Sequence, residues 1–388
     1  MSSFRGTKSL AMNKTVLDLV SQRLGTLANY IPGKPLRQAE RESGRAMIKL
    51  ASNENPFGPS PLAIEAIRKA AGEANLYPDN DATELRYTLA AHHDLPPENI
   101  FIADGSLGIL DVLARALLGP GLNCITSARS FISYPIVTRA SGGDLITTPL
   151  QRDTYDLDAI AAAINDETRV VMLANPNNPT GTMFHADATA AFLGRVPEHV
   201  LVVLDEAYHD FAQYFAVQRG ITYTRSLEYV REQRANVVVL RTFSKAHGLA
   251  GLRLGYACGH SELLQYFARL RNAFTVSVIA EAAGLAALRD RDHIRKTVEN
   301  NAAGAAWLME RFAEVGYRAV TTSANFIYFE VDENADAFAQ RMQAEGVIVR
   351  SLVPWGIRNG IRVTIGTPDQ NESFVRALRK VAAQTVGR

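Results

Sequence analysis

Residues 242–253 bring together side chains that suit amine chemistry beside a bound anion. They follow the apolar, β-branched run at 237–240, which predicts a strand buried on both faces. Where this run ends, the chain presents two hydroxyl groups, Lys245, two glycines and Arg253. Lysine is rarely buried unless it is paired or used chemically. We therefore predict a Schiff-base lysine at Lys245, beside a phosphate held by Ser244 and Arg253.

A carboxylate follows a second apolar run, at residues 201–204. Asp205 stands at the carboxyl end of this predicted strand, where an unpaired buried carboxylate would lose its charge. A protonated pyridine nitrogen is a suitable partner, because an aspartate beside it strengthens pyridoxal phosphate as an electron sink. The alternative is an acid that is capped or salt-bridged. Tyr208 would either bond the phenolic oxygen of that ring or pack nearby.

Two loops carry further candidate residues for the same site. The segment NPNNPTG at 175–181 follows another predicted strand, and its prolines and glycine favour a rigid loop. Asn178 in that loop offers both a donor and an acceptor. The segment DGSLG at 104–108 joins a predicted strand to a helix. Amides at a helix N-terminus form a natural phosphate site, although Ser106 as an ordinary N-cap is the alternative.

One aromatic residue and two arginines are further candidates. Phe131 could stack on a planar cofactor, although an aromatic residue in this setting most often belongs to the core. Arg350 and Arg362 fall in or next to predicted strands near the C-terminus. Arginine suits bidentate binding of a carboxylate or phosphate, and solvated surface charge is the alternative reading.

The elements that must position these residues alternate between helix and strand from about residue 83. Such alternation predicts an α/β fold with a mostly parallel sheet covered by helices, whose ligands bind beyond the carboxyl ends of the strands. We predict an N-terminal arm at 1–45, a large domain at 46–285 and a smaller C-terminal α/β domain at 286–388. The arm has too little periodic apolar content to fold alone.

Composition excludes several other classes of protein. The 388 residues are 47% hydrophobic with a net charge of +1, so no bulk attraction to nucleic acid or an anionic membrane is expected. No apolar run approaches the ~20 residues that span a bilayer. Cys124 and Cys258 are expected to be buried and reduced, as in a cytoplasmic protein. The histidines lack the paired spacing of a zinc site, and no metal is expected.

Taken together, the motifs resemble those of the fold-type-I pyridoxal-phosphate aminotransferases, which have the aspartate-aminotransferase-like fold. Within these, the chain looks most like the histidinol-phosphate aminotransferases. The resemblance runs from about Tyr30 to the C-terminus, with the motifs in the family's order and spacing. The motifs that carry it are NENP at 53–56, YP at 77–78, NNPTG at 177–181, DEAY at 205–208, SK at 244–245 and GLR at 251–253.

The resemblance implies a role for each candidate residue. Lys245 would hold the cofactor and, once freed by substrate, move the proton between Cα and C4′. Asp205 would pair with the ring nitrogen and Phe131 would stack on the ring, while Tyr208 and Asn178 bond the ring oxygen. The residues implied around the phosphate are Gly105, Ser106, Leu107, Thr242, Ser244, Arg253 and, across a dimer interface, Tyr77. The residues implied on the substrate side are Asn53, Arg350, Arg362 and, from the partner's arm, Tyr30.

The reaction implied by the family uses a small-molecule amino donor and a 2-oxo acid in a homodimer with shared sites. L-Histidinol phosphate and 2-oxoglutarate would give imidazole-acetol phosphate and L-glutamate, a step of histidine biosynthesis. Three alternatives use the same cofactor: an aromatic amino acid aminotransferase, a lyase like threonine-phosphate decarboxylase, and a non-catalytic regulator. The last usually carries a DNA-binding domain ahead of this fold, for which the short arm leaves no room.

Two positions depart from the family pattern. Leu107-Gly108 stands where an Asp or Asn followed by Glu is expected, so an acidic side chain near the cofactor is lost. Phe131 stands where many relatives carry tyrosine, which removes a hydroxyl and keeps the stacking.

Overall fold

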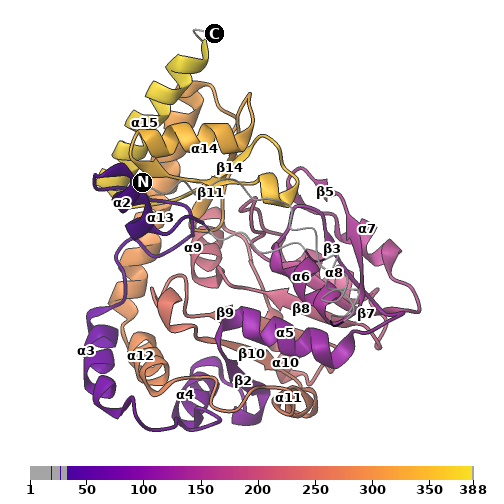
Figure 1. Ribbon diagram of the computed structural model, residues 1–388. Helices are drawn as coiled ribbons and strands as arrows, with labels where there is room; N and C mark the ends of the chain where they lie inside the picture. The colour runs from indigo at the N-terminus through magenta and orange to yellow at the C-terminus, as the bar shows by residue number, and fades with distance from the viewer. Residues whose placement is uncertain (1–18, 20–26, 28–32, 387–388) are drawn as a thin grey trace.

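The computed structural model describes residues 33–386 together with Leu19 and Leu27. Its centre is a seven-stranded sheet in the order β2-β10-β9-β8-β7-β3-β4 (Figure 1). The strands are β2 (Ile100–Ala103), β3 (Asn123–Ser127), β4 (Asp144–Thr148), β7 (Thr168–Ala174), β8 (Leu201–Asp205), β9 (Val237–Thr242) and β10 (Gly255–Gly259). All neighbours run parallel except β10, which is antiparallel to both β2 and β9. The predicted mostly parallel α/β sheet is confirmed.

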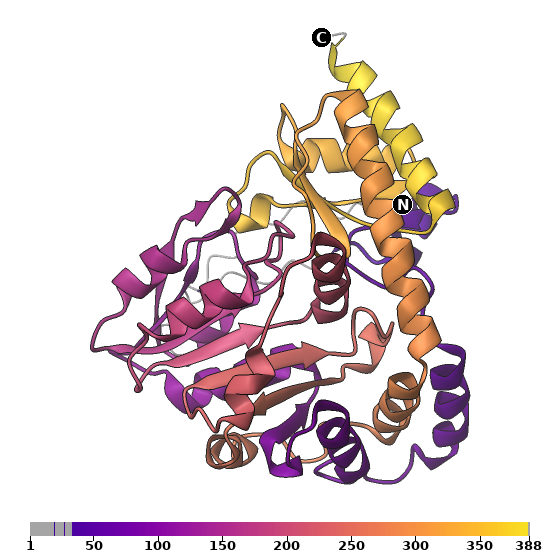
Figure 2. The same ribbon diagram turned by 180° about the vertical axis from the view of Figure 1, so that it is seen from behind.

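The central strands are apolar runs because helices cover both faces of the sheet. Every residue of β8 and of β9 is buried. Helices α5 (Gly105–Leu117) and α6 (Ser133–Ala140) lie on one face, and α7 (Leu157–Ala163), α8 (Ala186–Leu193) and α10 (Ser226–Arg231) lie on the other (Figures 1 and 2). The parallel strands therefore end together at one edge of the sheet, where the predicted site residues follow them.

A second unit, built mainly from the C-terminal residues, sits above that edge (Figure 1). Its antiparallel sheet has the order β11 (Phe326–Glu330), β14 (Gly360–Thr364) and β13 (Arg350–Ser351). Phenylalanine side chains from these strands and from helices pack together in its core, as the ring contacts of Phe312, Phe329, Phe338 and Phe374 show. The helices are α13 (Arg291–Val315), α14 (Ala335–Ala344) and α15 (Pro368–Val386).

The segment before the large sheet attaches to this second unit. Strand β1 (Ile48–Lys49) pairs in parallel with β12 (Val347–Ile348). Helix α2 (Leu36–Ser43), which the sequence analysis did not predict, packs through Ala39 against Met47 and Ile348. The domain boundaries given above stay a prediction. Within the described residues, no helix is long and apolar enough to cross a membrane.

Candidate active site

A cavity of about 460 Å³ lies where the carboxyl ends of β7, β8 and β9 meet the C-terminal unit. Parallel strands bring their ends to one edge, so residues far apart in sequence converge there. The predicted site residues that line it are Asn53, Ser106, Leu107, Phe131, Asn178, Asp205, Tyr208, Thr242, Ser244, Lys245, Arg253, Arg350 and Arg362. Tyr77 lies elsewhere on the surface and is 83% exposed. Tyr30 lies outside the described residues.

Lys245 follows β9 and extends into this cavity. Its Nζ lies 3.5 Å from the carbonyl oxygen of Ser52 and 5.6 Å from the ring centroid of Tyr208. Burial, followed by the positive charge of Arg362, lowers the pKa of Lys245 to about 8. Since the neutral amine is the nucleophile, this shift makes a larger share of Lys245 reactive near neutral pH.

Asp205 ends β8 and is 4% exposed. Its carboxylate accepts hydrogen bonds from the Tyr134 hydroxyl at 2.9 Å and from the Ala207 amide at 3.2 Å. Among the described residues it forms no ion pair within salt-bridge distance, and burial raises its pKa to about 6 despite the Tyr134 bond. A buried carboxylate with a raised pKa and no salt bridge among the described residues fits a ligand that brings its own positive charge, such as a pyridinium nitrogen.

Tyr134 is a site residue that the sequence analysis missed. It lies on α6 and is fully buried, and its ring meets Phe131 edge to face at 5.5 Å between centroids. It therefore touches the two residues predicted to bind the face and the nitrogen of the cofactor ring. A buried tyrosine hydroxyl needs a partner, and the buried Asp205 needs donors. The match between a donor that needs an acceptor and an acid that needs donors was the signal that could have identified Tyr134.

The N-terminus of α5 and the loop after β9 form a cradle for an anion. Gly105 has a φ of +86°, and a Cβ there would lie 2.7 Å from Nη2 of Arg253. A Cβ on Gly255 would lie 2.6 Å from the amide nitrogen of Ser106, so a side chain there would collide with the start of α5. Arg253 donates to the Ser244 hydroxyl at 3.4 Å, which leaves cation, hydroxyl and helix amides together. This donor set fits a phosphate.

The departure at Gly108 has a visible consequence. The carboxylate of Asp104 occupies the space that a side chain at Gly108 would need. An acidic group therefore stays at the start of α5, although it comes from a different position in the chain. Leu107 lines the cavity and is 41% exposed.

The predicted substrate and ring-oxygen residues contact one another across the two units. Asn53 donates to the Tyr208 hydroxyl at 2.9 Å. Arg362 donates to Oδ1 of Asn178 at 2.6 Å and to the carbonyl oxygen of Ala51 at 3.0 Å. Arg350 and Arg362 are opposite one another in the β13–β14 pair, so both belong to the wall facing Lys245.

A family model described as aminotransferase class I and II matches residues 45–378. The chain belongs to this family. Histidinol-phosphate aminotransferase from Moorella thermoacetica is 43% identical over 91% of this chain and 90% of that protein. Histidinol-phosphate aminotransferase 2 from Pseudomonas aeruginosa is 42% identical over 95% of this chain and 98% of its own length. The predicted membership of the pyridoxal-phosphate aminotransferases is confirmed.

Solved structures agree with the family assignment. The histidinol-phosphate aminotransferase from Sinorhizobium meliloti, in complex with pyridoxal-5'-phosphate, matches with a TM-score of 0.83 at 29% identity. The match covers 94% of this chain and 98% of that chain. A double-mutant aspartate aminotransferase of Thermus thermophilus has a TM-score of 0.79 at 22% identity, which shows the shared aminotransferase fold.

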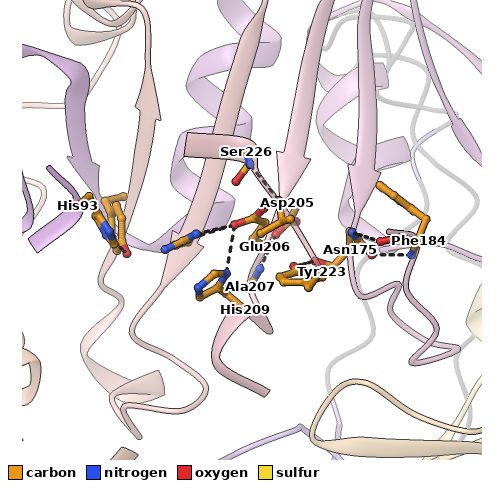
Figure 3. A network of polar contacts seen from close by, with 12 residues as sticks. His93, Asn175, Phe184, Asp205, Glu206, Ala207, His209, Tyr223 and Ser226 are labelled. Atoms are coloured by element: carbon orange, nitrogen blue, oxygen red, sulfur yellow. Dashed lines mark hydrogen bonds and ion pairs between the residues drawn. The ribbon is translucent and has the colours of Figure 1, made fainter. Parts of the chain in front are cut away.

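On the other side of Asp205, this aminotransferase has a second polar network, shown in Figure 3. Glu206 accepts hydrogen bonds from Nε and Nη2 of Arg241 at 3.1 and 2.8 Å and from the Thr224 hydroxyl at 2.8 Å. His209 Nδ1 lies 3.3 Å from the same carboxylate. Glu206, His209 and Arg241 line a separate cavity of about 370 Å³. Within the described residues, no group of His, Cys, Asp and Glu is arranged to hold a metal.

The same network fixes the loop that carries Asn178. The side chain of Asn175 donates to the carbonyl oxygen of Phe184 at 3.0 Å and accepts from its amide at 3.1 Å (Figure 3). The hydroxyl of Tyr223 donates to the Asn175 carbonyl oxygen. These bonds hold the two ends of the loop, so Asn178 is presented to the cavity from a rigid support.

Proposed function

We propose that this chain transfers the amino group of L-histidinol phosphate to 2-oxoglutarate, giving imidazole-acetol phosphate and L-glutamate. The observation that carries the proposal is one cavity that holds Lys245, the buried Asp205 and the arginine pair. Several histidinol-phosphate aminotransferases at 40–43% identity support the choice of amino donor. When bound, pyridoxal 5'-phosphate supplies an electron sink for negative charge at the substrate Cα.

The residues of this chain would divide the work as follows. Asp205, as a carboxylate, would keep a proton on the pyridine nitrogen, and Tyr134 donates the hydrogen bond that orients that carboxylate. Phe131 would pack against the ring face. Lys245 Nζ would hold the cofactor covalently and, once freed by substrate, would take the proton from the substrate Cα. Its lowered pKa suits a group that must both release and accept a proton.

Anion binding fixes both ends of the reacting pair. Ser106, Ser244 and Arg253 would hold the cofactor phosphate at the N-terminus of α5, with Gly105, Leu107 and Thr242 nearby. The proposed substrate anion lies between Arg350 and Arg362, with Asn53 nearby. Such positioning lowers the barrier because the reacting atoms are held in the productive geometry before reaction.

We further propose a homodimer with shared active sites. Tyr77 is 83% exposed and contacts Phe274, which is 44% exposed, at 4.7 Å between ring centroids, and Leu76 beside them is 58% exposed. Exposed apolar side chains gathered in this way favour a protein interface. The family pattern assigns Tyr77 and Tyr30 to the site of the partner subunit. We also propose a cytoplasmic location, which the buried free thiols of Cys124 and Cys258 support.

Mixing two inactive variants tests the shared sites. A Lys245→Ala homodimer lacks the amine, and a Tyr77→Ala homodimer lacks the residue proposed to cross the interface. A hybrid dimer would contain one site with both residues intact, so activity is expected to reappear after subunits are mixed and exchanged. No recovery in hybrids that have been shown to form would contradict a Tyr77 contribution in trans.

The substrate assignment has a competitor in aromatic amino acids. Leu107, Ile132 and Trp355 give the cavity an apolar wall that would accept an aromatic side chain. Single-turnover rates with L-histidinol phosphate and L-phenylalanine separate the two functions, and we expect a preference of at least tenfold for the phosphate ester. Equal or reversed preference would contradict the proposal. Release of carbon dioxide without a requirement for 2-oxoglutarate would indicate the lyase.

A further inference from the structure

Trp355 lies beside the two arginines proposed to bind the substrate anion. It ends the short 3-10 segment η5 (Val353–Trp355) between β13 and β14, and its ring lines the cavity. Arg350 and Arg362 are direct partners in the β13–β14 pair and are 7% and 6% exposed. Like charges directly opposite each other in a sheet repel, and contact with an aromatic face offsets part of that repulsion.

One aromatic ring contacts both guanidinium groups. The indole centroid of Trp355 lies 5.1 Å from Cζ of Arg350 and 5.9 Å from Cζ of Arg362. Attraction between a cation and an aromatic face is strongest for tryptophan and grows when water is excluded. The buried indole Nε1 has no hydrogen-bond partner among the described residues. The ring therefore acts through its face and not through its N–H group.

The position of this ring is fixed by its surroundings. Trp355 packs against the cluster of Tyr328, Leu352 and Ile357. Its amide donates to the carbonyl oxygen of Leu352 at 2.9 Å, and Gly356, with a φ of +75°, closes the turn behind it. The indole is therefore a rigid support for the arginine side chains.

Arg362 has further contacts that do not involve Trp355. It donates hydrogen bonds to Asn178 and Ala51, and its Cζ lies 5.3 Å from the ring centroid of Phe326. Loss of the indole would leave Arg362 held by these groups, whereas the spacing between the two guanidinium groups would lose its common support. An anion that uses one guanidinium and an anion that bridges both would then respond differently.

We propose that Trp355 is a positioning residue that sets the preference of this site for a phosphate monoester over a carboxylate. This inference rests on the proposed function, in which Arg350 and Arg362 bind the substrate anion. A phosphate monoester has three terminal oxygens and nearly two negative charges, so it can bridge two guanidinium groups. A carboxylate has two oxygens and one charge, and Arg362 alone satisfies it in a bidentate pair.

Binding of unreactive anions to the holoenzyme tests this role directly. The probes are n-propyl phosphate and glutarate, measured by calorimetry on the wild type, Trp355→Phe and Trp355→Leu. We expect Trp355→Leu to weaken n-propyl phosphate about tenfold and Trp355→Phe about threefold, with glutarate changed by less than about twofold. Equal weakening of both anions, or unchanged binding of n-propyl phosphate, would overturn the inference.

The chain offers a matched control in its other tryptophan. Trp307 on α13 has a similar contact, with Cζ of Arg311 at 5.3 Å, and does not line the cavity. Trp307→Leu is expected to leave the affinity for both probes unchanged. Trp355→Phe keeps a ring, so it remains informative if Trp355→Leu does not fold.

Turnover separates this inference from the proposed function. In single-turnover half-reactions, Trp355→Leu should raise the apparent dissociation constant for L-histidinol phosphate about tenfold. The limiting rate of this half-reaction should stay within about twofold of the wild-type rate, and the half-reaction with L-glutamate should be nearly unchanged. A wild type that does not react with L-histidinol phosphate would refute the proposed substrate. The calorimetric comparison would still decide the role of Trp355.

Discussion

Asp205 and Glu206 are adjacent in the chain, yet their carboxylates face different cavities on either side of the sheet edge. Both are almost completely buried, at 4% and 2% exposure. Burial raises the pKa of Asp205 to about 6. Burial acts on Glu206 in the same direction, but the Arg241 guanidinium and His209 hold the pKa of its carboxyl well below the usual range. The difference comes from the partners and not from the depth of burial.

This contrast separates structural charge from functional charge. Glu206 obtains its cation and its hydrogen bonds from within the fold, so its charge is compensated without a ligand. Asp205 receives two hydrogen bonds but no cation at salt-bridge distance among the described residues. A carboxylate in that state is stabilised when a ligand brings a positive charge, as a protonated pyridine ring does.

The largest expected effect concerns the buried ion pair between Glu206 and Arg241. Glu206→Gln keeps the size of the side chain but leaves the buried Arg241 charge without its partner. We expect the free energy of unfolding to fall by about 3–5 kcal/mol, measured by urea denaturation. The double variant Glu206→Gln/Arg241→Met is the control, because it removes both charges and should recover part of the loss. A loss below about 1 kcal/mol in the single variant would contradict the description of this pair.

The matching change at Asp205, in the cavity that contains Lys245, should affect activity instead of stability. Asp205→Asn keeps the shape of the side chain and removes the charge that would hold a proton on the pyridine nitrogen. We expect the rate of the first half-reaction to fall by about 10²–10³-fold, measured by single-turnover absorbance. Retention of more than a tenth of the wild-type rate would show that the carboxylate is not needed.

The apoprotein provides a test of how much stability is lost when the buried Asp205 becomes charged. The folded protein keeps a proton on Asp205 up to about pH 6, whereas the unfolded chain releases it near pH 4. The stability due to this group is therefore fully present below pH 4 and lost as the pH rises to about 6. An asparagine side chain does not titrate, so the apo Asp205→Asn variant does not lose this stability. Its free energy of unfolding relative to that of the wild-type apoprotein should therefore increase by about 1–3 kcal/mol between about pH 4 and pH 6 and stay constant above about pH 6. Urea denaturation of both apoproteins from pH 4.5 to 8 measures the difference, and a constant difference would contradict the raised pKa.

The smallest expected effect comes from Tyr134. Its hydrogen bond lowers the pKa of Asp205, so Tyr134→Phe should raise that pKa in the apoprotein and extend to higher pH the range over which apoprotein stability falls. The loss of one buried hydrogen bond should cost about 0.5–1.5 kcal/mol of stability. An unchanged pH dependence of apoprotein stability would mean that Tyr134 only packs against Phe131.

Much of this site followed from the sequence because parallel strands end together. The run at 237–240 became β9 (Val237–Thr242), and the run at 201–204 became β8 (Leu201–Asp205). The polar residues after each strand could therefore be assigned to one cavity before their positions were known. The order and spacing of the motifs indicated the protein family, which the periodicity of apolar residues alone does not reveal.

Other features depended on contacts that periodicity does not encode. The antiparallel direction of β10 is set by pairing with β2 and β9, and an apolar run reads the same in either direction. Helix α6 contains Pro135 and β-branched residues, so its local preference for helix is low. The Tyr134–Asp205 bond and the placement of Trp355 over two arginines join segments that only the folded chain brings together.

The central claim is that Lys245 bonds the cofactor in the cavity that contains Asp205. Treatment of the holoenzyme with borohydride, followed by proteolysis and mass spectrometry, tests it directly. The account predicts a pyridoxyl group on the peptide that contains Lys245, and its absence from the Lys245→Ala variant. A label on another lysine, or a labelled Lys245→Ala protein, would contradict the account.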